Sequence, residues 1–539
     1  MIPDEQVVTP ISLSLAPYTG AWTKDEAAHL LRRSLFGPKF SQIIDAVANG
    51  MDATVTQLLT IPSYGEPLTV SPNESIVAQG STWINSVYPT NIVDKQNTEN
   101  ARRESLGAWQ LELINRESLS IHQKMCLFWQ NHFAAESTFD SRATYDYHKL
   151  IFDNAYGNFK QLIKDITINP SILVFLNGAQ NNVYSPNENY ARELLELYTI
   201  GKGVQIGEGD YTNYTELDVQ QGAKILTGWT IQNFQSDTVA SASSYFEPTF
   251  HDTTVKTLSA HFGNAVIPNA GVNEYSNYID VIFQQPETAK FICRKIYRWF
   301  VNYDLTADVE STIITGMSNT LIANNYEIFP VMEELLKSEH FYDISVRGSI
   351  IKNPLELIFS ILNSTHSVTT YDLATNYQMY LNTYWLAGAL GMNYHQPPNV
   401  GGWYAYYQAP SFSKLWVNSS YIKLRFQFAD YLTIYGGIDV NGNKFAVNHF
   451  EFLNNLSLPS DAIQVIEDMS TVFSAKGLSV IEKTTLKAVL TNGLPDFEWT
   501  LQYNEYLADP TNIVVSDPVK QRVALTLAQL FKLPEFQTI

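Results

Sequence analysis

Cysteine and long apolar runs are both scarce in this sequence. Only two of its 539 residues are cysteines, Cys126 and Cys293, which excludes a zinc site built on thiolates and makes a disulfide framework unexpected. No run of about 18 apolar residues occurs, so we expect no segment that spans a bilayer. The first residues are acidic and contain no signal peptide, so a cytoplasmic protein and a processed, exported protein both fit this chain.

Basic charge is also scarce. The chain has 34 Lys and Arg against 54 Asp and Glu, and its formal net charge at pH 7 is -20. Non-specific binding to nucleic acid needs clustered Lys and Arg, so the sequence predicts a protein that does not bind nucleic acid. Charged residues make up only 16% of the chain and hydrophobic residues 45%, which is typical of a well-buried globular protein.

Most of the chain shows the periodicity of helices separated by polar loops. A capping box from Thr23 to Glu26 predicts the start of the first helix. Strand-like patterns are confined to the aromatic, Ser/Thr-rich stretch 230–266 and to the turn at Asn441-Gly442, which is typical of a tight hairpin.

These patterns predict a mainly α fold. We expect a large multi-helix globular domain with long ordered loops and at most minor β-hairpins. The length allows one large or two fused domains. We expect residues 1–20 to be an N-terminal extension and 21–539 to be a single domain, with 440–539 forming a C-terminal helical subdomain.

The clearest single helix is predicted over residues 185–201. Ser185 fits the N-cap position, Pro186 fits the first helical position, and Glu188 completes an S-x-x-E capping box with Ser185. Gly201 fits the left-handed residue that commonly follows the last turn of a helix.

One face of this helix gathers Arg192, Glu193 and Glu196 next to Glu188. One interpretation is a solvated polar stripe in which Glu188 and Arg192 form an i,i+4 pair. The other is that Glu193 and Glu196, one turn apart, direct two carboxylates at a shared ligand. Buried carboxylates need a cation or strong hydrogen-bond donors, and either Arg192 or a metal ion would satisfy that need.

Two histidines elsewhere are candidates for the same site. His132 shares an apolar helix face with Met125 and Phe128, a pattern more typical of a hydrogen-bonded core histidine than of a ligand. His251 and Asp252 stand side by side in the irregular stretch, where they fit either a ligand or base pair, or an exposed histidine beside a turn-capping aspartate.

Several short segments resemble, in the same order, the bacterial family called domain of unknown function 1800. The resembling segments run almost from end to end: AHLLRRSLFG at 28–37, FWQNHF at 128–133, NENYARELLEL at 187–197, TGW at 227–229, FHD at 250–252, KNP at 352–354, QPPNVGGW at 396–403 and LPEFQ at 533–537. The resemblance implies a mainly helical fold and one family domain over nearly the whole chain, without an established activity. Genes of this family often neighbour those of a second uncharacterised family that resembles sulfatases and phosphatases, which implies a partner of that kind.

The sequence supports three hypotheses of different class. The first is an enzyme that binds a divalent metal ion through His132, Glu193, Glu196 and His251. The second is a non-catalytic binding or scaffold protein in which the charged cluster is a buried salt-bridge network and a surface near Trp403 binds a protein or glycan partner. The third is metal-free acid–base hydrolysis by two carboxylates.

Under the enzyme hypothesis the catalytic residues are Glu193, Glu196, Arg192 and Asp252. The two glutamates would hold the metal ion or move protons, and Arg192 would orient an anionic substrate or neutralise a carboxylate. Asp252 would complete the site together with His251. The site is thus centred on the helix predicted over 185–201.

Overall fold

The computed structural model of the chain describes residues 11–136 and 140–539. It confirms the mainly α fold, because within those ranges strands occur only as four short antiparallel pairs and helices form the rest of the framework. Residues 1–10 of the predicted extension lie outside the described residues. No helix in the described part of the chain is both long and apolar enough to cross a membrane.

The elements follow one another in four groups along the chain. The first group contains α1 (Lys24–Ser34), α2 (Phe40–Asn49), α3 (Met51–Leu58), α4 (Ile92–Asn115), α5 (His122–His132), α6 (Ser141–Asp153), α7 (Phe159–Thr167) and α8 (Pro170–Phe175). The second contains α9 (Glu188–Glu193), η2 (Leu194–Thr199), β1 (Gln205–Gly207), β2 (Asp210–Tyr211), α10 (Glu216–Ile225), β3 (Trp229–Gln232), β4 (Ser243–Phe246), β5 (Lys256–Thr257), β6 (Val266–Ile267), α11 (Glu274–Ile282) and α12 (Pro286–Phe300).

The second half of the chain supplies the other two groups. The third contains α13 (Ala307–Val309), η6 (Glu310–Ile314), α14 (Thr315–Ala323), α15 (Ile328–Lys337), α16 (Pro354–Leu362), α17 (Leu373–Ala389) and α18 (Ser419–Thr433). The fourth contains β7 (Ile438–Val440), β8 (Asn443–Phe445), α19 (His449–Asn454), α20 (Ala462–Phe473), α21 (Val480–Leu490), α22 (Asp496–Ala508), α23 (Ile513–Leu530) and α24 (Pro534–Gln537). Short 3-10 turns are η1 (Gly178–Gln180), η3 (Pro248–Phe250), η4 (Ala260–Phe262), η5 (Gly271–Asn273), η7 (Tyr404–Tyr406) and η8 (Phe412–Trp416).

Local signals placed several of these elements correctly. Thr23 and Glu26 form the predicted capping box at the start of α1. Asn441 and Gly442 both have positive φ, 54° and 86°, as a two-residue turn between β7 and β8 requires. Helix α4 begins without an apolar signal, because Ile92 is 73% exposed and the first turns carry no apolar periodicity.

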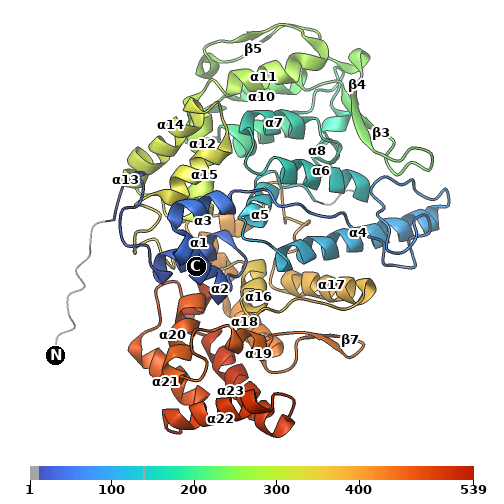
Figure 1. Ribbon diagram of the computed structural model, residues 1–539. Helices are drawn as coiled ribbons and strands as arrows, with labels where there is room; N and C mark the ends of the chain where they lie inside the picture. Colours follow the sequence, from blue (N-terminus) through green and yellow to red (C-terminus); the bar gives the residue numbers. More distant parts are fainter. Residues whose placement is uncertain (1–10, 137–139) are drawn as a thin grey trace.

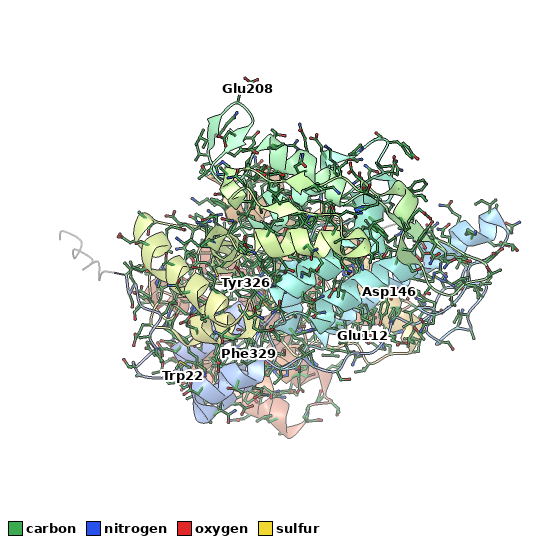
Figure 2. All side chains as sticks on the ribbon, turned by 90° about the horizontal axis from the view of Figure 1, so that it is seen from above. Trp22, Glu112, Asp146, Glu208, Tyr326 and Phe329 are labelled. Atoms are coloured by element: carbon green, nitrogen blue, oxygen red, sulfur yellow. The ribbon has the colours of Figure 1, made fainter. Side chains whose placement is uncertain are left out.

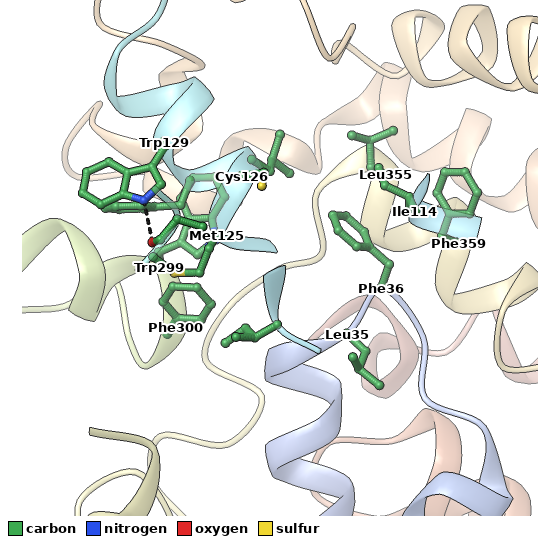
Figure 3. Packing of buried hydrophobic residues seen from close by; sticks show 14 of the residues in the cluster. Leu35, Phe36, Ile114, Met125, Cys126, Trp129, Trp299, Phe300, Leu355 and Phe359 are labelled. Atoms are coloured by element: carbon green, nitrogen blue, oxygen red, sulfur yellow. Dashed lines mark hydrogen bonds between the residues drawn. The ribbon is translucent and has the colours of Figure 1, made fainter. Parts of the chain in front are cut away.

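The core lies where α1, α5, α12 and α16 meet. Figure 3 shows Phe36, at the end of α1, beside Leu355 and Phe359 of α16, with Met125 and Trp129 of α5 on the other side. These side chains are at most 3% exposed. Segments far apart in the sequence therefore form one continuous apolar interior.

Both ends of the described chain are tied to this core. Residue Pro17 pairs with Ser338, and Thr538 pairs with Ile351, each through an isolated β-bridge. Figure 1 places the C-terminus beside α1, while α19–α23 gather at the opposite end from β4 and β5. Helix α20 nevertheless packs against α1 and α2. A separate subdomain over 440–539 stays a prediction.

Candidate functional site

The predicted helix over 185–201 begins two residues later than expected. Asn187 is the N-cap of α9, and its side chain accepts a hydrogen bond from the Asn189 backbone N–H at 2.9 Å. The prediction that Ser185 caps the helix was wrong, because Ser185 closes a turn with Asn182 instead. Glu188 is thereby free of capping, and it pairs with Arg192 across one helical turn as one of the two interpretations expected.

The second half of the helix is a π-helix rather than an α-helix. Over η2 the hydrogen bonds reach five residues back, as from Ile200 N to Leu195 O at 3.1 Å. Gly201 then ends the segment with φ of 74°, as the sequence predicted. Successive residues of a π-helix are rotated by less than the 100° of an α-helix. The side-chain directions expected for an α-helix therefore hold only as far as Glu193.

His132 and Lys295 bind the end of this π-helix. The Lys295 ammonium donates to Leu197 O at 2.8 Å, and His132 Nε2 donates to Tyr198 O at 3.1 Å. Lys295 Nζ also donates to His132 Nδ1 at 3.1 Å, so both ring nitrogens of His132 are engaged. Burial and the nearby Lys295 charge hold the pKa of His132 well below its usual value, and burial with Arg298 lowers the pKa of Lys295 to about 7.

Arg192 is bound to a carboxylate outside the helix. Its two terminal nitrogens donate to the two oxygens of Glu216 at 2.7 Å each, and Nη2 also donates to Glu188 at 3.1 Å. This bidentate bond holds the pKa of Glu216 below its usual value. The side chain of Arg192 is 31% exposed, so the network is partly solvated rather than buried as the scaffold hypothesis assumed.

Glu193 and Glu196 therefore share no arginine. Glu196 accepts a hydrogen bond from the Tyr214 hydroxyl at 3.0 Å and lies 3.5 Å from Lys202 Nζ. Glu193 makes no hydrogen bond or ion pair with the described residues. Burial first, and repulsion from Glu196 second, raise the pKa of Glu193 to about 7. At neutral pH the Glu193 carboxyl is thus close to half protonated.

His251 and Asp252 belong to a different network, centred on Glu274 of α11. His251 Nε2 lies 3.0 Å from Glu274, its Nδ1 lies 2.9 Å from Thr227 O, and the buried Lys256 pairs with the second Glu274 oxygen at 2.6 Å. The Asp252 carboxylate accepts from the Thr254 backbone N–H at 2.8 Å, which is the turn-capping role.

The structure thus brings together Glu193, Glu196 and Arg192 but places the two histidines elsewhere. His132 contacts the backbone of the π-helix, and His251 contacts Glu274. Within residues 11–136 and 140–539, no group of three or more His, Cys, Asp or Glu side chains is arranged to hold a metal ion.

A pocket of about 380 Å³ lies where the sequence indicated no site. It opens between the loop 62–68, the end of α4 and the start of α5, and its walls include Tyr64, Trp109 and Tyr377. Glu117 lines it: one carboxyl oxygen accepts from Phe36 N at 2.7 Å, and the other is buried and has no partner among the described residues. Burial raises the pKa of Glu117 to about 8. The only sequence signal was an acidic residue in a short turn between two apolar helices.

Fold and site together define a large, mainly helical protein with paired carboxylates at the junction of α9 and the π-helix η2. Comparison with protein-family models matches residues 29–538 to the family described as "Protein of unknown function (DUF1800)". The chain therefore belongs to this family, as its sequence segments had indicated. No curated protein and no solved structure matched the chain.

Proposed function

We propose that this DUF1800 protein is an enzyme that moves a proton with the carboxylate pair Glu193 and Glu196. Glu193 is the proton donor and acceptor, because its pKa near 7 lets it hold or release a proton at neutral pH. Glu196 is the charged partner, oriented by the Tyr214 hydroxyl. The single observation that carries this proposal is the raised pKa of a carboxyl group that has no hydrogen-bond partner of its own.

The surrounding residues support this division of roles. Arg192 forms its hydrogen bonds with Glu216 and Glu188, and it lowers the pKa of Glu193 less than burial and Glu196 raise it. Lys295 and His132 bind the carbonyl end of the π-helix, which positions the turn that carries Glu196 and directly follows Glu193. The chemistry that fits is general acid–base catalysis by two carboxylates, the third hypothesis from the sequence.

The metal-dependent version of the site has less support. A metal ligand needs a free lone pair, and both ring nitrogens of His132 and of His251 are engaged by other groups. A site that includes these histidines and Asp252 therefore requires rearrangement of two hydrogen-bond networks. The wider set stays a prediction, and metal analysis of the purified protein tests it.

Glu117 is a second location at which the same chemistry could take place. Glu117 also has a raised pKa and an unpartnered oxygen, and it lines a pocket of about 380 Å³. This volume falls within the range of small-molecule sites, and three aromatic side chains in the walls add apolar contact area. Glu117 would serve there as a proton donor to a bound substrate.

A substrate screen with matched variants tests both locations. The purified protein is assayed against chromogenic glycosides, esters and phosphate esters, and every turnover found is repeated with Glu193→Gln, Glu196→Gln and Glu117→Gln. Loss of a proton-transfer group lowers kcat by roughly 100-fold or more. Glu208→Gln is the control, since Glu208 stands at the exposed tip of the β1–β2 turn (Figure 2).

The outcome assigns the site. A kcat that falls in Glu193→Gln and Glu196→Gln but not in Glu117→Gln supports the helix site, and the reverse pattern supports the pocket. Turnover that survives in all three variants at the level of Glu208→Gln contradicts the proposed function.

A further inference from the structure

Positive charge is concentrated in the protein interior between α1, α5, α16 and α18. Five basic side chains with at most 6% exposure gather there, and among residues 11–136 and 140–539 one carboxylate with 7% exposure accompanies them. The basic residues are Arg32, Arg33, Lys124, Lys352 and Arg425, and the carboxylate is Glu356. Three of the family segments meet at this place, namely 28–37, 352–354 and 533–537, and the proposed function uses none of them.

Both carboxylate oxygens of Glu356 already have partners. Glu356 forms an ion pair with Lys124 through one oxygen and accepts a hydrogen bond from Asn353 N at 2.9 Å through the other. Two further acids lie near the cluster without balancing it. Asp25 faces Arg32 but is exposed to solvent, and Glu117 faces Lys124 with a pKa of about 8, so it is mostly protonated at pH 7.

Several donors in this cluster have no acceptor. Arg32 Nε and Ser364 Oγ are buried without a hydrogen-bond partner among the described residues, and so are Nε and Nη1 of Arg33. The Lys352 ammonium makes no ion pair with a described carboxylate and lies 3.6 Å from the centre of the Phe536 ring. Unpaired buried charges are costly, so a negative group is missing from this arrangement.

A small cavity lies among these donors. Its polar walls are formed by Arg32, Lys124, Lys352 and Ser364 and by Glu356, whose carboxylate is paired with Lys124. Leu35 and Phe36, from the core shown in Figure 3, complete the walls. Its volume is about 10 Å³. A single water molecule needs about 10–15 Å³ on this scale, so the cavity is about the size of one water molecule and is too small for a phosphate or a nucleotide. A chloride ion is slightly larger than a water molecule, and it enters with a small outward shift of the flexible Lys352 and Arg32 side chains.

We propose that this cavity is a binding site for one monatomic anion of the size of chloride, held by Lys352, Arg32 and the Ser364 hydroxyl. The anion supplies the charge that Glu356 alone does not provide. It joins α1 and α16 to the segment 533–537 through a shared counter-ion. Burial and repulsion from Arg32 lower the pKa of Lys352, and burial and repulsion from Arg347 lower the pKa of Arg32 to about 9.

A second source of the same charge lies at the cavity wall. Ile539 lines the cavity, so an α-carboxylate on that residue would compete with a dissolved anion for the same donors. The test therefore uses protein that ends at Ile539, in which a carboxylate at this position has every opportunity to occupy the site.

The test measures binding directly by the line width of the chlorine-35 NMR signal. Protein is titrated with chloride at constant ionic strength, with gluconate as the replacing anion. We expect excess broadening that saturates and that bromide removes by competition. Lys352→Met keeps the apolar stem and removes the charge, so it weakens chloride binding about tenfold or more.

The matched control is Lys423→Met, which removes a solvent-exposed lysine from α18 and leaves the broadening unchanged. Ser364→Ala, a smaller change, gives a second variant should Lys352→Met fail to fold, and it also reduces the broadening. Broadening that is absent in the wild type, or equal in wild type, Lys352→Met and Ser364→Ala, overturns the proposal. Absence of broadening combined with a loss of thermal stability when a neutral Gly-Ser-Gly extension follows Ile539 would identify the carboxylate as the occupant instead.

Discussion

Two regions of the molecule carry an excess of charge of opposite sign, and they resolve it differently. The junction of α9 and the π-helix places Glu193 beside Glu196, and Lys202 and the Tyr214 hydroxyl lie near the second carboxylate. The core between α1 and α16 gathers five basic side chains around Glu356. The first region is partly solvated, so a proton taken from water removes the repulsion. The side chains of the second are buried, and arginine does not give up its proton readily, so a counter-ion is needed.

The degree of burial of a charge cluster decides which kind of chemistry the cluster supports. A half-buried carboxyl can exchange its proton with solvent or substrate, which is what acid–base catalysis requires. A cluster buried in the core exchanges nothing with substrate and contributes to stability instead. We therefore expect substitutions in the buried basic cluster to affect stability most, and substitutions at the partly solvated carboxylates to affect it less.

Glu356→Gln removes the carboxylate that pairs with Lys124 inside the basic cluster. The amide retains the hydrogen bond from Asn353 but leaves Lys124 unpaired, so we expect a loss of about 3–5 kcal/mol in the free energy of unfolding. Urea titration measures it, with the exposed Glu505→Gln as the control. Saturating chloride reduces the loss if the cavity binds an anion. A change below about 1 kcal/mol would contradict the importance of charge balance in this core.

Glu193→Gln changes how stability depends on pH. The pKa of Glu193 is raised in the folded protein, from an ordinary 4.5 to about 7, so the folded state holds this proton more tightly than the unfolded state. The protonated Glu193 carboxyl therefore adds to the free energy of unfolding below pH 4.5, and this contribution is lost as pH rises towards 7. The variant therefore matches wild type near pH 4 and exceeds it near pH 8, by about 1 kcal/mol after allowance for partial exposure.

Urea titrations at the two pH values measure that difference. Glu208→Gln, at the exposed turn, serves as the control. Equal stability differences between Glu193→Gln and wild type at pH 4 and pH 8 would show that the Glu193 carboxyl has an ordinary pKa in the folded protein.

Arg192→Ala has the smallest expected effect on stability. Its ion pairs with Glu216 and Glu188 are partly exposed, and such pairs contribute about 1 kcal/mol or less. A scaffold held by a buried network would lose several kcal/mol, so thermal or urea unfolding of this variant separates the two accounts. A loss above about 3 kcal/mol would favour the scaffold hypothesis.

Local signals in the sequence were sufficient for much of the fold. The Thr23–Glu26 capping box and the Asn441-Gly442 hairpin depend on neighbouring residues only, and both were predicted. The closeness of Glu193 and Glu196 also followed from their spacing on one helix. The π-helical turn, in contrast, depends on Lys295 and His132, which are distant in the sequence and bind its terminal carbonyls.

Contacts between distant segments explain the remaining differences. Arg192 is bound by Glu216, which belongs to α10, and His251 is bound by Glu274, which belongs to α11. No periodicity in the sequence indicates either partner. The pocket at Glu117 is formed by a loop and two helix ends, so its residues show no common spacing.

Glu193 is partly protonated near neutral pH because its carboxyl group is buried and, second, because Glu196 lies beside it. NMR titration of the protein labelled with carbon-13 at the glutamate carboxyl carbons measures this pKa, with Glu193→Gln identifying the signal. We expect a pKa near 7 in the wild type and a lower value in Glu196→Gln, where the repulsion is gone. A wild-type pKa near 4.5, unchanged in Glu196→Gln, would contradict the account.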